Sequence, residues 1–269
     1  GAFGHFLDPR VISNIVENPQ LLNQLGGDAR VMTAFFSDVA SFSAISENLT
    51  PVELVETINE YLTEMCEVIE EHNGTIDKFE GDAIVAFWGA PIVQEDHAEN
   101  SVLAAIDMQA RMDDLRKKWE DEGTMLELRE KWEADGRGTF FSVRMGINTG
   151  EMVVGNMGSK PRVDYTMLGD AVNLAARLEG AGKPYGVTTM ISESTYLITR
   201  ALIEARELDS IRVVGKEEPV RVYEVLGKKG EVDAHKLQVV DLFTEGVNKY
   251  RERHWDEAIS LFEQGLELD

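Results

Sequence analysis

The chain has 269 residues and carries 26 Lys and Arg against 49 Asp and Glu, a net charge of −23 at pH 7. So acidic a surface repels nucleic acids and anionic lipids, and we expect no nucleic-acid partner and no membrane contact by this fragment. The single cysteine, Cys66, excludes an internal disulfide framework and a Cys-rich zinc site. The longest uncharged apolar run, residues 83–93, is too short to cross a membrane.

The N-terminal part of the chain indicates a fragment of a longer protein. The chain begins Gly1-Ala2 without Met, and we expect a cytoplasmic fragment whose parent protein can carry a membrane anchor. Residues 8–25 predict one or two short helices, because Asp8 suits an N-cap and Pro9 suits the first turn. We assign residues 1–29 to an N-terminal helical coupling segment.

The next part predicts a strand, a long helix and a hairpin. Residues 31–36 form an apolar run short enough for a buried strand. Thr50-Pro51-Val52-Glu53 has the pattern of a capping box, and apolar residues at helical spacing follow it as far as Asn73-Gly74. Residues 75–79 and 83–88 predict two hairpin strands with Asp82 at the tip.

The rest of the pattern completes an α+β order. Residues 96–119 predict a helix, and we interpret the highly charged residues 115–138 as its solvated extension. The remaining predicted elements are a hairpin at 140–148 and 151–156, a helix at 171–179, a strand at 187–191, a helix at 192–199, and strands at 211–214 and 220–225. The order predicts a split βαβ sheet of the ferredoxin-like βαββαβ type.

A Gly-bounded linker at residues 227–230 precedes a C-terminal helical hairpin at residues 236–269. Its small residues Gly246 and Ala258 and its aromatic residues Tyr250 and Phe262 resemble the core of one tetratricopeptide repeat. Gly265 departs from that pattern, and a generic amphipathic helix pair is the alternative. A single repeat cannot bury its own face, so we expect further repeats and a protein partner for them.

Two carboxylates stand at predicted strand ends. Asp38 follows the strand at 31–36, and Asp82 occupies the tip of the hairpin. If the two strands are neighbours, both carboxylates leave the sheet at the same end, as a Mg²⁺ or Mn²⁺ site requires. The alternative is that Asp38 caps a helix and Asp82 is a turn residue, which are the commoner roles of such residues taken singly.

Four further polar residues are candidates. Asn173 and Arg177 are four apart on one predicted helix face, where an exposed face is the alternative explanation. Arg144 lies among apolar residues of a strand and needs an anion or an acidic partner. Lys78 lies in the strand that leads to Asp82, where a structural lysine can also extend its ammonium to solvent.

Together these residues lie in four motifs that resemble the catalytic domain of class III adenylate cyclases. The motifs are FFSDVASFS at residues 35–43, KFEGDA at 78–83, VRMGINTG at 143–150 and YTMLGDAVNLAARL at 165–178. Four ordered motifs are far more specific than any one of them. The resemblance covers about residues 30–226, and it implies a catalytic domain over residues 30–228.

The resemblance implies a role for each matching position in the reaction. Asp38 and Asp82, with the carbonyl of Val39, would hold two Mg²⁺ or Mn²⁺ ions per active site. Arg177 would stabilise the α-phosphate in the transition state, and Arg144 would contact the distal phosphates. The implied reaction converts ATP to 3′,5′-cyclic AMP and pyrophosphate.

The resemblance also implies which residues bind the nucleoside. Lys78 matches the position that contacts adenine N1, and Thr166 matches the position that accepts a hydrogen bond from the adenine amino group. Asn173 would orient the ribose, and Phe42 lies in the motif at the nucleotide-binding position. Thr166 also resembles the Thr-containing, bicarbonate-responsive subclass. Guanylate cyclases usually carry Glu and Cys where this chain has Lys78 and Thr166.

One position departs from the family pattern. Relatives often have a triphosphate-binding Lys where this chain has Val214, and Lys216 is the nearest substitute. A lost phosphate contact costs about 1.5–3 kcal/mol, enough to lower activity without abolishing it. This departure mildly favours a catalytically weak regulatory module, while Lys78 and Thr166 disfavour a guanylate cyclase. A diguanylate-type cyclase is discounted, because Gly26-Gly27-Asp28 precedes the first predicted strand.

The resemblance implies a head-to-tail homodimer with two equivalent sites. One subunit would supply Asp38, Asp82 and Arg144, and the other would supply the nucleoside-binding residues and Arg177. Because this chain contains both sets, a lone monomer is expected to be inactive.

Overall fold

The computed structural model describes residues 12–13, 16–17, 25–159, 162–211 and 219–268. Ile12, Ser13, Val16 and Glu17 are helical, and the rest of the helix prediction for residues 8–25 lies outside the described residues. Lys216 and the Val214 departure from the family pattern also lie outside them.

One sheet organises the chain, and its strand order is β2-β3-β1-β4-β6-β8-β7, with β5 pairing to β4 outside this path. The first four strands enclose α3 and α4 in the order β1-α3-β2-β3-α4-β4, and they lie in the sheet as β4-β1-β3-β2. This is the predicted ferredoxin-like α+β arrangement. The strands are β1 (Gly26–Val39), β2 (Thr75–Glu80), β3 (Ala83–Trp88), β4 (Val143–Ser159), β5 (Arg162–Leu168), β6 (Thr189–Ser192), β7 (Ile203–Ile211) and β8 (Val220–Lys228).

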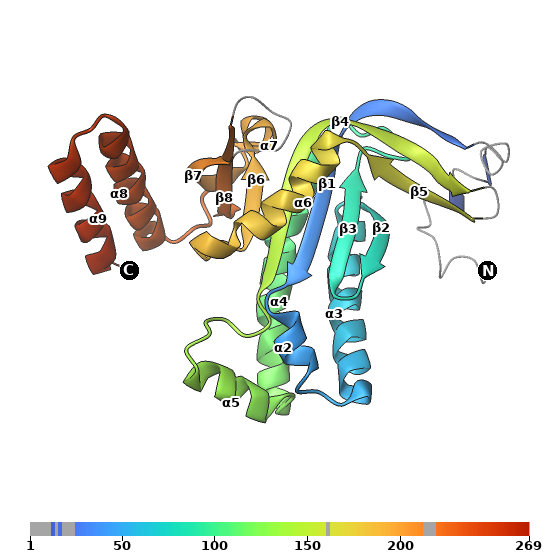
Figure 1. Ribbon diagram of the computed structural model, residues 1–269, viewed down its shortest axis with the longest axis horizontal. Coiled ribbons are helices and arrows are strands. Elements are labelled where there is room, and N and C mark those ends of the chain that lie inside the picture. The colour runs from blue at the N-terminus through green and yellow to red at the C-terminus, as the bar shows by residue number, and fades with distance from the viewer. Residues whose placement is uncertain (1–11, 14–15, 18–24, 160–161, 212–218, 269) are drawn as a thin grey trace.

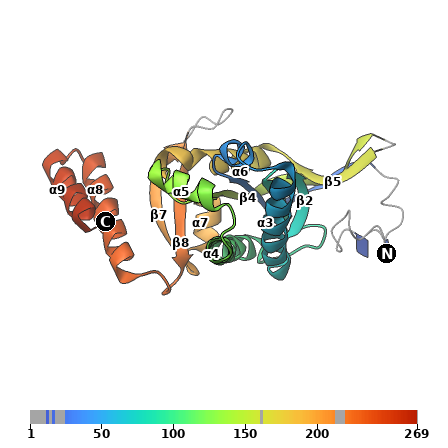
Figure 2. The ribbon, with the colours of Figure 1, turned by 90° about the horizontal axis from the view of Figure 1, so that it is seen from below.

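Helices cover both faces of this sheet, with α3 and α4 on one face and α6 on the other (Figures 1 and 2). The helical elements are α2 (Phe42–Ser46), α3 (Pro51–Glu71), α4 (His97–Glu122), α5 (Leu126–Ala134), α6 (Asp170–Ala181), the 3-10 helix η3 (Lys183–Tyr185), α7 (Glu193–Thr199), α8 (Ala234–Arg251) and α9 (Trp255–Leu268).

The alternation of side chains along the central strands creates two cores. Phe35 of β1 and Trp88 of β3 point towards α3 and α4, and their rings meet edge to face at 6.0 Å. Ala34 and Phe87, one position earlier in each strand, lie in the second core with Ala175 of α6. Successive residues of a strand point to opposite faces, so a strand buried on both faces shows the continuous apolar run found in the sequence.

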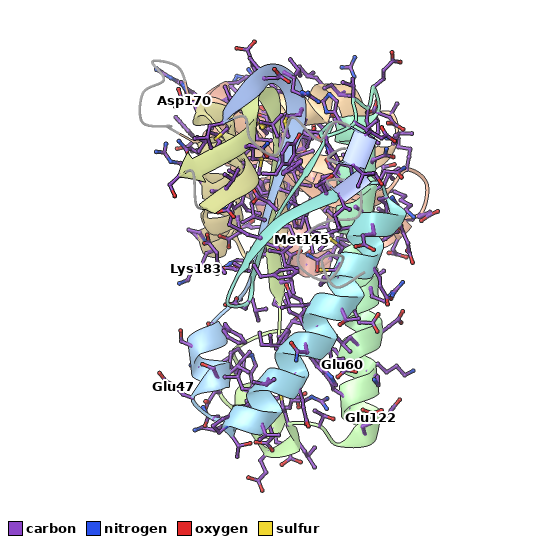
Figure 3. The ribbon with its side chains drawn as sticks, turned by 90° about the vertical axis from the view of Figure 1, so that its right-hand side faces the viewer. Glu47, Glu60, Glu122, Met145, Asp170 and Lys183 are labelled. Atoms are coloured by element: carbon purple, nitrogen blue, oxygen red, sulfur yellow. The ribbon has the colours of Figure 1, made fainter. Side chains whose placement is uncertain are left out.

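The long helix α3 begins where the sequence predicts. The Thr50 side chain accepts a hydrogen bond from the Glu53 backbone, and the Glu53 carboxylate accepts one from the Thr50 backbone at 2.8 Å. This confirms the capping box. Lower in the molecule, Glu60 of α3 accepts a hydrogen bond from the Trp119 indole of α4 at 2.8 Å, which joins the two helices (Figure 3).

The predicted hairpin at residues 140–148 and 151–156 is wrong, because β4 runs unbroken from Val143 to Ser159. Asn148-Thr149-Gly150 resembles a turn, but Gly150 serves close packing: a Cβ there would lie 3.2 Å from the Cβ of Ala171 on α6. The true hairpin partner is β5, which the sequence analysis missed.

Two other predictions need correction. The interval 115–138 is largely helical and exposed, as predicted, but it is not fully solvated and α4 ends within it at Glu122. Trp119 and Trp132 are buried and pack edge to face against Phe141 and Phe140, respectively. Of the strand predicted at residues 211–214, only Ile211 is among the described residues, and it is the last residue of the longer strand β7. Residues 212–214 lie outside the described residues.

The C-terminal helices α8 and α9 form a hairpin beside β7 (Figure 1). An ion pair of 2.9 Å between Arg251 and Glu207 ties this hairpin to β7, and the Arg206 guanidinium lies over the Phe243 ring. A Cβ at Gly246 would lie 2.6 Å from the Phe262 ring, so this glycine allows the two helices to approach closely. Among the described residues, no helix is both long enough and apolar enough to cross a membrane.

Candidate active site

The two carboxylates chosen from the sequence lie together at the end of β1. Asp38 is the last residue but one of β1, and Asp82 lies in the turn between β2 and β3. The backbone N–H of Val39 donates a hydrogen bond of 2.8 Å to Oδ2 of Asp82. Because β3 pairs with β1 in antiparallel register, the β2–β3 turn lies beside the end of β1.

Arg144 supplies the positive charge beside these carboxylates. It lies directly opposite Asp38 in the β1–β4 register, and its Nε and Nη2 donate to the two carboxylate oxygens of Asp38 at 3.1 and 2.9 Å. The same Nε is also 3.1 Å from Oε1 of Glu179 on α6. The acidic partner that a half-buried arginine requires is therefore present in the same chain.

The pKa values at this edge reflect crowding of negative charge. Burial raises the pKa of Asp82, and the nearby charge of Asp38 raises it further. Burial and the adjacent Asp38 carboxyl raise the pKa of Glu179 to about 7, although the Arg144 guanidinium opposes both effects. The negative charges of Asp38 and Asp82 repel each other, and a cation bound between the two carboxylates would relieve this repulsion.

The donor set at this edge fits a divalent metal ion shared with a phosphate ligand. Asp38, Asp82 and the Val39 carbonyl are hard oxygen donors, which Mg²⁺ and Mn²⁺ prefer. No group of three or more His, Cys, Asp or Glu side chains that could hold a metal occurs within the described ranges. Mg²⁺ is commonly bound by one or two carboxylates with substrate phosphates completing its shell, so two carboxylates are enough.

A second group of predicted residues meets where β5 approaches β2. The β4–β5 arm curves across the α6 face of the sheet (Figure 1), and Tyr165 of β5 packs against Phe87 of β3 at 6.1 Å. Thr166 Oγ1 donates a hydrogen bond of 2.6 Å to Asp77, and the ammonium of Lys78 lies 3.7 Å from the same carboxylate. Lys78 and Thr166 are thereby brought to one place.

The other predicted residues take separate positions. Asn173 and Arg177 are both exposed on α6, whose opposite side packs on β4 so closely that a Cβ at Gly146 would lie 2.2 Å from the Glu179 backbone nitrogen. Phe42 begins α2, is half-buried and contacts the Phe141 ring at 6.5 Å. Neither Asn173 nor Arg177 has a hydrogen bond or ion pair with Asp38 or Asp82 within the described part of the chain.

Comparison with known proteins decides the family. Residues 28–227 match the adenylate and guanylate cyclase catalytic domain. The chain belongs to this family. It is 35% identical over 196 residues to adenylate cyclase 1 of Rhizobium meliloti, covering 73% of this chain and 27% of that protein. It is 34% identical over 230 residues to the adenylate cyclase of Anabaena cylindrica, covering 83% of this chain and 42% of that protein. The chain thus spans less than half the length of these two relatives.

Solved structures give the same result. The crystal structure of the adenylyl cyclase CyaB from P. aeruginosa is 34% identical, with a TM-score of 0.65 and coverage of 78% of this chain and 100% of that one. The guanylyl cyclase Cya2 is 32% identical, with a TM-score of 0.62 and coverage of 77% and 97%. An adenylyl cyclase and a guanylyl cyclase therefore share this fold. Because the fold is common to both, individual side chains must decide whether adenine or guanine is bound.

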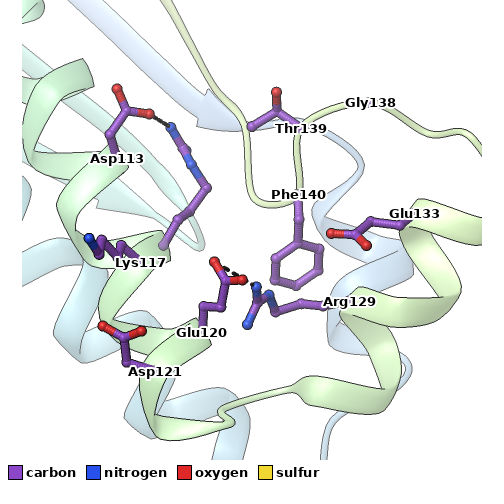
Figure 4. A pocket seen from close by; sticks show the side chains of 10 residues that line it. Asp113, Lys117, Glu120, Asp121, Arg129, Glu133, Gly138, Thr139 and Phe140 are labelled. Carbon is purple, nitrogen blue, oxygen red and sulfur yellow. Dashed lines mark hydrogen bonds and ion pairs between the residues drawn. The ribbon is translucent and has the colours of Figure 1, made fainter.

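A cavity of about 520 Å³ lies elsewhere in this cyclase domain, between α4 and α5 (Figure 4). Two of the cations that line it are already paired, Arg116 with Asp113 at 2.5 Å and Arg129 with Glu120 at 3.5 Å. None of the residues predicted for catalysis lines it. The candidate active site therefore does not include this cavity.

Two residues of this site escaped the sequence analysis. Asp77 lies in a bulge, where the β2–β3 register shifts between Ile76 and Lys78, and strand alternation cannot predict where a bulged side chain points. Glu179 is the last charged residue of the α6 motif region and meets Arg144 only through the packing of α6 on β4. In the sequence, Asp77 could have been noticed only because it is an acidic residue directly before Lys78.

Proposed function

We propose that this chain is an adenylate cyclase that converts ATP to 3′,5′-cyclic AMP and pyrophosphate. The observation that carries this proposal is the meeting of Thr166 and Lys78 on the Asp77 carboxylate, although Thr166 and Asp77 are 89 positions apart. A lysine donor and a hydroxyl acceptor match N1 and the 6-amino group of adenine. The catalytic unit is proposed to span residues 26–228 and not to begin at residue 30 as expected, because β1 of the sheet begins at Gly26. The residues before Gly26 are proposed as a coupling segment, and residues 236–269 as a repeat-like hairpin.

Two Mg²⁺ or Mn²⁺ ions, when bound, lower the pKa of the ribose 3′-hydroxyl and neutralise charge on the triphosphate. Asp38 and Asp82, with the Val39 carbonyl, are the residues proposed to hold them. Asp38 is 29% exposed, so solvent and substrate can reach it. Its contact with Arg144 keeps the carboxylate oriented towards this edge before the substrate arrives.

The side chains of the two groups are proposed to position the reacting atoms. Asn173 orients the ribose so that its 3′-oxygen attacks the α-phosphorus in line with the departing pyrophosphate oxygen. The new bond joins the 3′-oxygen to the α-phosphorus, the bond from phosphorus to the bridging oxygen breaks so that pyrophosphate leaves with that oxygen, and the 3′-hydroxyl proton passes to solvent water. Arg177 donates to the α-phosphate oxygens, and Arg144 and Lys216 contact the distal phosphates.

The active site is proposed to form between two subunits arranged head to tail. Each subunit contributes its carboxylates and Arg144 to one site and its Lys78, Thr166 and α6 side chains to the other. Asn173 and Arg177 support this arrangement because they are exposed on α6 and available to a second copy.

Three finer assignments accompany this proposal. Thr166 favours the Thr-containing, bicarbonate-responsive subclass. The α8–α9 hairpin lies outside the residues matched by the cyclase family, and we propose it as the start of a tetratricopeptide region that binds a protein partner. The use of ATP as substrate favours a cytoplasmic location.

Chromatographic product analysis with ATP or GTP and Mn²⁺, over a dilution series of the purified chain, tests the proposal. Cyclic AMP from ATP, with specific activity that falls on dilution, is the expected result. Cyclic GMP as the main product would overturn the base assignment and favour a guanylate cyclase. Loss of all activity at every concentration, together with retained nucleotide binding, would favour a regulatory module.

A further inference from the structure

Asp77 is a nearly inaccessible carboxylate beside the base-binding residues. Its side chain is 2% exposed, whereas the adjacent Lys78 side chain is 43% exposed. The bulge in β2 interrupts the alternation of side chains, which lets two consecutive residues act on the same region. A buried carboxylate is costly unless it is paired, so its partners reveal what it does.

Every partner of Asp77 is a hydrogen-bond donor. Thr166 Oγ1 donates to Oδ2 at 2.6 Å, the Met167 backbone N–H donates a further hydrogen bond, and the Lys78 ammonium lies 3.7 Å from Oδ1. The amide and the ammonium can only donate, but the threonine hydroxyl can donate or accept. An ionised carboxylate can only accept, so the Thr166 hydroxyl is the donor in its hydrogen bond to Asp77.

This contact removes the ambiguity of Thr166. With its proton engaged by Asp77, the hydroxyl presents only lone pairs to any ligand. The 6-amino group of adenine donates a hydrogen bond and is satisfied by such an acceptor. The 6-carbonyl oxygen of guanine or hypoxanthine accepts, so it would face a second acceptor with no proton between them.

We propose that Asp77 is a positioning residue that makes Thr166 an obligatory acceptor and thereby selects a 6-aminopurine nucleotide over a 6-oxopurine nucleotide. The inference rests on the proposed function, which places Thr166 at position 6 of the base. Asp77 acts through Thr166 and does not itself contact the substrate. Its pairing with Lys78 restrains a lysine whose donors suit the unprotonated N1 of adenine and oppose the N1–H of a 6-oxopurine.

The test compares ATP with inosine triphosphate, which has the 6-carbonyl of guanine without its 2-amino group. The measured quantity is the ratio of kcat/KM for ATP to kcat/KM for inosine triphosphate. In Asp77→Asn the amide nitrogen can donate to Thr166, which frees the hydroxyl proton for the 6-carbonyl. We expect this ratio to fall by about tenfold or more, because an enzyme discriminates most strongly where a mismatched polar group is left unpaired.

Matched variants separate this role from a structural one. Asp164→Asn removes one negative charge from the same β5 strand at an exposed position and is expected to leave the ratio unchanged. In a Thr166→Val background, Asp77→Asn is expected to have no effect on the ratio, because the hydroxyl through which Asp77 acts is gone. Since the ratio is taken within one preparation, any inactive fraction of the protein cancels.

Two outcomes would overturn the inference. The first is an unchanged ratio in both Asp77→Asn and Asp77→Ala, and the second is an equal fall with and without Thr166. The ratio of the dissociation constants of the two nucleotides tests the same base discrimination in the ground state, without turnover. If the wild-type chain makes no cyclic AMP, the proposed function fails, and the binding ratio still decides the role of Asp77.

Discussion

The backbone N–H of Val39 donates a hydrogen bond of 2.8 Å to the carboxylate of Asp82, across 43 positions of sequence. This contact joins the end of β1 to the β2–β3 turn and holds Asp82 near Asp38. It also anchors the backbone at Val39, whose carbonyl, in the following peptide unit, is the third proposed oxygen donor.

Substitution of either carboxylate is expected to abolish most of the activity. Asp38→Ala or Asp82→Ala removes a metal-binding oxygen donor, and metal ions stabilise such transition states by several kcal/mol. Since about 1.4 kcal/mol is a factor of ten, we expect kcat/KM to fall by at least about 100-fold. Asp28→Ala, at the exposed far end of β1, is the matched control and should retain activity. Comparable activity in Asp38→Ala and Asp28→Ala would show that the metal assignment is incorrect.

Mixing two inactive variants tests whether the site is shared between subunits. Asp38→Ala and Arg177→Ala damage different residue sets, so a mixed dimer retains one intact site. Random pairing then restores about one quarter of the wild-type activity, because half the dimers carry one good site of two. A mixture of Asp38→Ala with Asp82→Ala, which damage the same set, should restore none. Equal results from the two mixtures would exclude a shared site.

Gly146→Ala is expected to displace α6. The added Cβ would lie 2.2 Å from the Glu179 nitrogen and 2.4 Å from the Ala175 oxygen, and backbone atoms of a helix cannot move singly. We expect a loss of about 1–3 kcal/mol in the free energy of unfolding. Activity should also fall, because α6 carries Asn173 and Arg177. The control is Gly180→Ala on the same helix, where an added Cβ meets nothing within 4 Å. Equal melting temperatures for the two variants would contradict this packing argument.

Glu179 is expected to make stability depend on pH in the metal-free protein. Burial and the adjacent Asp38 carboxyl raise its pKa from 4.5 to about 7, so between these values the folded state binds a proton that the unfolded state releases. The free energy of unfolding should therefore decrease as pH rises from about 4.5 to about 7. In Glu179→Gln, the free energy of unfolding should depend less on pH. This variant should be more stable than wild type at the upper end of the pH range.

Urea titrations at several pH values, with chelator present, measure this dependence. The exposed residue Glu263 on α9 provides the control, and Glu263→Gln should keep the wild-type slope. A Glu179→Gln protein with the same pH slope as wild type would refute the assigned cause.

The sequence alone determined the local elements and the residue types of the site. Thr50 and Glu53 marked the start of α3 because a capping box is made within one turn, and the strands around Asp82 followed from composition and a short turn. The βαββαβ order was likewise predictable, since each element buries a face that its own periodicity reveals. The carboxylates, Lys78, Thr166 and Arg177 were named from motifs alone.

Only the tertiary structure decided which of these side chains are in contact. It also decided which glycines lie in turns and which lie within a strand. Gly150 had the appearance of a turn residue, yet it lies in the unbroken strand β4, where it pairs with Met32 of β1 and leaves little space for a side chain beside Ala171 of α6. The meeting of Asp77 with Thr166 depends on a bulge and on the curvature of the β4–β5 arm, neither of which leaves a periodic signal in the sequence. Local order follows from near neighbours along the chain, whereas side-chain contacts across the sheet follow from packing over its full width.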